Sequence, residues 1–125
     1  MHVRSQPIVR LHLWLETEKG VFFGLGRLQL LKDIQAGQSL KGAAEHLGMS
    51  YRAAWGKIKK TEEVMGVRLI EKRRGNRQGY QLTEAGQLLA ASFEQWFQDV
   101  EAYALKRARA LFPCEPKAFK DPPAT

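Results

Sequence analysis

The alternation of apolar and polar residues near the N-terminus predicts a strand with one buried face. Two sets of side chains alternate in residues 8–16, with Val9, Leu11, Leu13 and Leu15 in one set and Arg10, His12, Trp14 and Glu16 in the other. A period of two places such sets on opposite faces of a strand. A turn at Gly20 would return the chain as a second strand over 21–23, which Gly24 would end. We therefore expect an N-terminal β-hairpin within residues 1–24.

Apolar residues at spacings of three and four then predict three helices, over 27–36, 40–47 and 51–65. Their expected inward side chains are Leu28, Leu31, Ile34 and Gln35 in the first helix, Leu40, Ala43, Ala44 and Leu47 in the second, and Ala54, Ile58, Thr61 and Met65 in the third. The residues expected to cap or stop these helices are Ser39 and Ser50 at the N-termini, and Gly37, Gly48 and Gly66 at the C-termini.

The second half of the chain predicts two short strands followed by one long helix. Strands over 67–72 and 80–82 would flank a polar, glycine-containing loop at 73–79. A helix capped by Thr83 and ending near Leu111 would be roughly 44 Å long. Its broad apolar stripe is formed by Ala85, Leu88, Leu89, Phe93, Trp96, Phe97, Val100, Tyr103, Ala104, Ala108 and Leu111. The tail that follows is rich in proline, and we expect it to be disordered.

Composition narrows the class of protein. The chain has 125 residues, of which 44% are hydrophobic and 26% are charged, which suits one small globular domain. Its single cysteine excludes an intramolecular disulfide and an all-cysteine metal site. The sequence has no apolar run of the roughly 18 residues that a membrane span needs, and charged residues interrupt its N-terminus where a signal peptide would be apolar. We therefore expect a cytoplasmic protein.

Positive charge is concentrated in one part of the sequence. Twenty lysines and arginines against thirteen carboxylates give a net charge of +7. Residues 50–79 hold nine of these cations and only three carboxylates, so six of the seven net charges lie in this window. Composition alone favours a solvated charged face, but the order of elements around this window favours a polyanionic partner.

That order is the layout of a winged helix-turn-helix: two short helices joined by a tight turn, then strand, loop and strand. The pair Ala43-Ala44 is small enough for two helices to cross closely, and Gly48 tolerates a positive φ in the turn. The fold class is therefore mainly α with small β content (α+β). The four expected segments are a hairpin at 1–24, a winged helix-turn-helix at 25–82, a long dimerisation helix at 83–112 and a disordered tail at 113–125.

The third helix is the expected recognition helix. With Ala54, Ile58 and Met65 inward, the exposed face is expected to carry Tyr51, Arg52, Trp55, Gly56 and Lys59. An exposed tryptophan is unfavourable for a monomer but suits a surface that enters a DNA groove. The alternative is that Trp55 packs beneath the hairpin or the wing.

Residues 8–111 resemble the DNA-binding part of the ModE family of molybdate-responsive bacterial repressors and, more distantly, the winged helix of LysR-type regulators. Three segments carry this resemblance: AAEHLGMSYRAAW, EEVMGVRLIEKR and QLTEAGQLL. The resemblance implies contacts with DNA by Ser50, Tyr51, Arg52, Trp55 and Lys59 of the recognition helix, and by Arg73, Arg74, Asn76, Arg77 and Gln78 of the wing. It also implies dimerisation through the long helix, where our candidate interface residues are Leu89, Phe93, Trp96, Phe97, Val100, Tyr103 and Ala104.

The sequence departs from the ModE pattern after the long helix. Members of that family continue into oxyanion-binding domains, whereas only about fourteen residues follow here. We therefore expect no molybdate site. Three histidines without ligand spacing and the absence of a catalytic constellation predict no metal, no cofactor and no enzymatic activity.

Two functions remain as hypotheses. The first is a homodimeric, sequence-specific regulator of transcription that binds double-stranded DNA. Arg52 is its candidate guanine contact, and Arg73, Arg74 and Arg77 are its candidate backbone contacts. The alternative is a protein-interaction module without specific DNA binding, for example an accessory that pairs with a full-length ModE-like regulator through the long helix.

Overall fold

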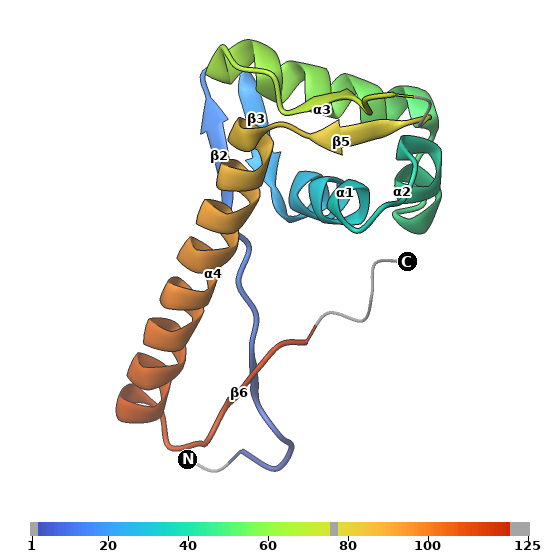
Figure 1. The fold of residues 1–125 in the computed structure, drawn as a ribbon. Coiled ribbons are helices and arrows are strands. Elements are labelled where there is room, and N and C mark those ends of the chain that lie inside the picture. The colour runs from blue at the N-terminus through green and yellow to red at the C-terminus, as the bar shows by residue number, and fades with distance from the viewer. Residues whose placement is uncertain (1–2, 76–77, 121–125) are drawn as a thin grey trace.

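Four helices and three two-stranded sheets make up the described part of the fold. The computed structural model describes residues 3–75 and 78–120. The elements are β1 Ile8–Val9, β2 Trp14–Thr17, β3 Gly20–Gly24, α1 Leu25–Gln35, α2 Leu40–His46, α3 Tyr51–Met65, β4 Ile70–Lys72, β5 Tyr80–Leu82, α4 Glu84–Leu111 and β6 Lys117–Ala118. The predicted class, mainly α with small β content, is confirmed. In Figure 1, α1, α2, α3 and β5 form a compact group at one end, and α4 extends away from it.

The N-terminal hairpin is shorter than predicted. β2 and β3 pair antiparallel, with Trp14 opposite Gly24, and the register shifts after Leu15. The two predicted faces are confirmed, because every second residue from Val9 to Leu15 is half-buried and its neighbours are exposed. The single strand over 8–16 is wrong, because β1 is separated from β2 and pairs with β6 instead.

The three predicted helices are present, with small corrections. α1 begins two residues earlier than predicted, and Gln35 is exposed whereas Leu30 is fully buried. α2 and α3 begin as predicted, and Met65 is exposed because it lies in the last turn, beyond the core. Ser39 caps α2 by accepting from Gly42 N at 2.9 Å.

One core joins the hairpin, the three short helices and the start of α4. Its largest fully buried side chains are Phe23, Leu30, Leu31, Ile34, Ile58, Leu69, Ile70 and Thr61. Thr61 is polar, and its hydroxyl donates to the carbonyl of Phe22, which ties α3 to the hairpin. A buried hydroxyl is tolerated when it is hydrogen-bonded, so Thr61 holds the recognition helix on the hairpin without an unsatisfied polar atom.

The wing strands and α4 also agree with the pattern. β4 is three residues long rather than six, and β5 matches the prediction. Thr83 caps α4 by accepting from Gly86 N at 3.0 Å, and the helix ends at Leu111 as expected. None of the helices among the described residues is long and apolar enough to cross a membrane.

The tail differs from its prediction. Residues 113–120 are placed against the N-terminal segment, where β6 pairs parallel with β1. Backbone hydrogen bonds run from Lys117 N to Pro7 O at 3.0 Å and from Phe119 N to Val9 O at 3.1 Å. Figure 1 shows both segments beside the outer half of α4, which they contact. Proline composition suggested disorder, but these pairings come from a segment over a hundred residues away, which composition does not reveal. The rest of the tail lies outside the described residues.

Candidate nucleic-acid interface

The turn between α2 and α3 leaves the start of the recognition helix open to solvent. Gly48 has φ of 68°, the left-handed conformation that favours glycine at a helix end. Ser50 is exposed, and its hydroxyl accepts from Ala53 N at 3.0 Å. The positive end of the helix dipole therefore faces solvent at Ser50, which favours a nearby phosphate.

The outward face of α3 carries only part of the predicted DNA-contacting set. Tyr51, Arg52 and Gly56 are exposed, as expected. For Arg52, none of the described residues provides a hydrogen-bond or ion-pair partner. A guanidinium without an intramolecular partner keeps all its donors for a ligand, so Arg52 is the best-placed side chain on this face.

Trp55 lies elsewhere than on that face. It is half-buried against the core, and its ring centroid is 5.6 Å from that of Tyr80 in the wing. Lys59 is also half-buried, with Nζ 4.3 Å from the centre of the Trp55 ring. The expectation of full exposure is therefore wrong for both, and the alternative in which Trp55 packs beneath the wing is correct. The role of Tyr80 was not predicted, and its only signal in the sequence is its position two residues before Leu82, on the same face of β5.

A second link between α3 and the wing is the carboxylate of Glu62. It accepts from the amides of Leu69, at 2.7 Å, and Ile70, at 3.3 Å, and pairs with Lys59 Nζ at 2.8 Å. Burial alone would raise the pKa of Glu62. The Lys59 hydrogen bond, the two amides and the Lys59 charge outweigh burial, so its pKa is lowered. Glu62 therefore fixes the start of the wing to the recognition helix. Its carboxylate also forms an ion pair with Lys59, which leaves that ammonium less available to DNA.

The predicted cations of the wing differ in exposure and in their hydrogen bonds to the protein. Arg73 is half-buried, and its Nε donates to Tyr80 O at 3.2 Å, so it fastens the two wing strands together. Arg74 and Gln78 are exposed. Asn76 and Arg77, two further predicted contacts, lie outside the described residues. Arg74 is thus the described wing cation best placed for a phosphate.

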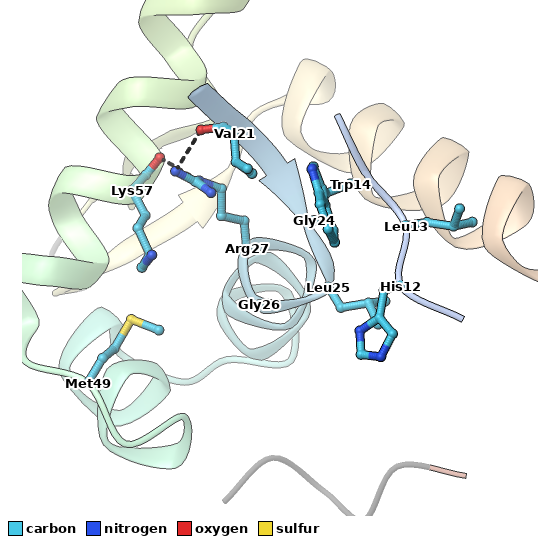
Figure 2. Close-up of a pocket in the computed structure, with 10 residues that line it drawn as sticks. All are labelled: His12, Leu13, Trp14, Val21, Gly24, Leu25, Gly26, Arg27, Met49 and Lys57. Atoms are coloured by element: carbon cyan, nitrogen blue, oxygen red, sulfur yellow. Dashed lines mark hydrogen bonds between the residues drawn. The ribbon is translucent and has the colours of Figure 1, made fainter. Parts of the chain in front are cut away.

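A pocket of about 380 Å³ lies on the opposite side of α3, between the hairpin, the start of α1 and Met49 (Figure 2). Arg27 spans it, with Nε donating to Lys57 O at 3.2 Å and Nη2 to Val21 O at 3.4 Å. Burial lowers the pKa of the Arg27 guanidinium. Arg27 therefore links the hairpin to the recognition helix through these two hydrogen bonds. This role of Arg27 is not visible in the sequence, because both of its hydrogen-bond partners are backbone carbonyls.

The predicted dimer-interface residues on α4 differ in how far they are buried. Phe93 is only 3% exposed and packs edge-to-face on Phe23, with ring centroids 5.2 Å apart, so it belongs to the chain's own core. Tyr103 is 64% exposed and Trp96 is 36% exposed. The other four are half-buried: Leu89, Phe97, Val100 and Ala104. Two further apolar side chains of α4 are exposed, Leu88 at 67% and Leu111 at 64%.

Comparison with known families supports the winged-helix assignment. The family model for bacterial regulatory helix-turn-helix proteins of the LysR family matches residues 25–87. The molybdenum-pterin-binding protein MopA of Rhodobacter capsulatus is 32% identical over 93 residues, which cover 73% of this chain. The chain spans about a third of the length of MopA, 35%. This relative supports the resemblance to ModE-like domains.

Two solved structures have a similar fold. The CbnR DNA-binding domain in a complex with DNA has a TM-score of 0.52 at 21% identity, over 67% of this chain and 92% of that chain. The BenM DNA-binding domain in a complex with catB site 1 DNA has a TM-score of 0.54 at 19% identity, over 70% of this chain and 92% of that chain. The family match covers α1, α2, the recognition helix and the wing, so the chain belongs to the LysR family of bacterial regulatory helix-turn-helix proteins and has a ModE-like winged helix.

Proposed function

We propose that this DNA-binding regulator recognises a specific double-stranded sequence as a homodimer. The observation that carries the proposal is the outward face of α3, where Arg52 is exposed next to the open helix N-terminus at Ser50 and has no hydrogen-bond or ion-pair partner among residues 3–75 and 78–120. A recognition helix contacts base edges with its N-terminal residues in the major groove. Arg52 would contact a guanine, with Ser50 and Tyr51 beside it.

The other predicted contact residues would either bind the sugar–phosphate backbone or orient the wing relative to the recognition helix. Arg74 and Gln78 of the wing would contact phosphates, together with Asn76 and Arg77. Trp55, Lys59 and Arg73 are held by Tyr80 and Glu62, so we assign them mainly to the orientation of the wing relative to α3. Phosphate contacts fix register and base contacts carry specificity.

The exposed apolar residues of α4 support dimerisation. Leu88, Trp96 and Tyr103 present large apolar side chains to solvent along one helix. Exposed apolar surface of this kind commonly marks a protein interface. A symmetric pair of α4 helices would place two recognition helices in successive major grooves, about 34–36 Å from centre to centre.

The proposal is tested by selecting bound fragments from a random duplex library at about 50 and 200 mM salt. We expect a palindromic motif whose affinity falls by about 10³-fold or more between these salt concentrations, for six or more phosphate contacts. Binding without a motif would contradict the proposal. In that event the same apolar surface of α4 would favour the alternative, an accessory module that pairs with another regulator, and its stoichiometry would be measured with such a protein.

A further inference from the structure

One glycine in the recognition helix has no explanation in the fold. Gly56 lies in the middle of α3, is exposed, and has no positive φ. A Cβ built on it would meet none of the described atoms within 4 Å. Glycine in a helix interior is less stable than alanine because it loses more conformational freedom. The fold would therefore gain stability from alanine at this position.

The glycine in α4 shows the opposite situation. A Cβ on Gly86 would lie 2.2 Å from Leu69 O, so the close crossing of α4 and the segment before β4 requires glycine. Gly66 is likewise explained, by a φ of 69° at the end of α3. Neither close packing nor backbone conformation requires glycine at 56, so its cause lies outside the described protomer.

The position of Gly56 indicates what that cause is. It lies one turn after Arg52 and one turn before Lys60, and neighbours four apart share a helix face. Arg52 is exposed on one side of this stretch of bare backbone. On the other side Lys60 is half-buried, and its Nζ donates to Lys19 O in the hairpin turn at 3.2 Å. Amides in a helix interior already bond within the helix, so this stretch offers a phosphate no donor. It offers space instead, which suits a base edge.

We propose that Gly56 is the point of closest approach between the recognition helix and the floor of the major groove. The edge of a base pair would occupy the space of the missing side chain, next to Arg52. Any side chain at 56 would hold the helix away from the groove and lengthen the contact of Arg52 with its base. This inference rests on the proposed function and makes Gly56 a determinant of specificity.

The test uses Gly56→Ala and Gly56→Gln in the full chain, with the sequence selected by the wild-type protein. We expect Gly56→Ala to raise the Tm by a few degrees, about 4 °C, because it is the better helix former. Affinity for the selected sequence should fall about tenfold for alanine, and further for glutamine, because the side chain meets a close-packed surface. Affinity for unrelated duplex at low salt should change less than twofold.

Gly26→Ala is the matched control. Gly26 is also an exposed helix glycine with nothing described within 4 Å of a built Cβ, but it lies in α1, at the pocket of Figure 2. Gly26→Ala should change affinity for the selected sequence by less than twofold relative to the wild-type protein. Unchanged affinity in Gly56→Ala, or a lower Tm, would overturn the inference while leaving the proposed function intact. An equal loss on all sequences would also overturn it, since a phosphate would then be the close neighbour. If the wild-type protein selects no sequence, the proposed function itself fails.

Discussion

The two amphipathic helices α3 and α4 differ in what they present to solvent. Both bury one face in the same core, α3 with Ala54 and Ile58 and α4 with Ala90 and Phe93. The outward face of α3 presents Arg52 to solvent, and Lys57 of the same helix is also exposed. Large apolar side chains are exposed along α4, from Leu88 through Trp96 to Tyr103.

This difference teaches that the two helices are suited to different partners. A cationic helix face next to a wing is stable in water and gains energy from phosphates and base edges. An apolar helix face is costly in water and gains energy when another apolar surface covers it. Variants of both helices and of the wing test this contrast.

The largest effect is expected where α4 is made polar. Leu88→Asp combined with Tyr103→Asp places two charges on exposed positions, so each protomer should fold as before. The proposed dimer should dissociate, and affinity for the selected sequence should fall about 100-fold or more, because two linked recognition helices bind far more tightly than one. Sedimentation and DNA titration measure the two effects. The control Gln98→Asp adds a charge at another exposed position of α4 and should change neither. A double variant that remains dimeric would show that α4 is not the interface.

The next largest effect is expected on folding. Gly86→Ala would bring a Cβ to 2.2 Å from the Leu69 carbonyl, a backbone atom that moves only with β4. Overpacking of this kind should lower the free energy of unfolding by about 2–3 kcal/mol, measured by urea denaturation. Gly56→Ala in the same assay should raise it. If both variants are equally stable, the contrast between a structural glycine in α4 and a functional one in α3 does not hold.

The third prediction separates base contacts from phosphate contacts. Arg52→Ala should cost ~1–3 kcal/mol of binding free energy at one base position and relax specificity there. Its matched control is Arg74→Ala in the wing. This change should weaken all sequences alike and flatten the dependence of log K on log salt by about one unit. Competition titrations with single-base variants of the selected site measure both. Equal loss on every sequence for Arg52→Ala would remove it from the base contacts.

The smallest effect is expected from Glu62→Gln. The lowered pKa of Glu62 in the fold means that its carboxylate stabilises the native state above the ordinary pKa of the unfolded chain, 4.5. That contribution is lost as the pH falls through the lower native pKa. The variant should be about 1 kcal/mol less stable at pH 7, and the difference should shrink below about pH 4. Urea titrations across pH measure this, with the exposed Glu63→Gln as control. A difference that does not depend on pH would contradict the ionic role.

Local sequence determined the helices, their caps and most of their buried faces. Ser39, Ser50 and Thr83 each cap the helix predicted from the following apolar pattern. These features depend on hydrogen bonds within three residues and on periods of two or 3.6, so a short stretch of sequence contains all the information. The family resemblance rested on such stretches, and its winged helix is confirmed for the same reason.

Tertiary structure alone decided which side chains of these helices remain free. Trp55 and Lys59 fell on the exposed side of a helical wheel, yet Tyr80 and Glu62 hold them against the wing. In the sequence Phe93 is one residue of a broad apolar stripe, and only its contact with Phe23 shows that it belongs to the core. The parallel pairing of β1 with β6 joins segments more than a hundred residues apart. Helical periodicity gives the direction of a side chain but not the neighbour that covers it, because that neighbour comes from a distant part of the chain.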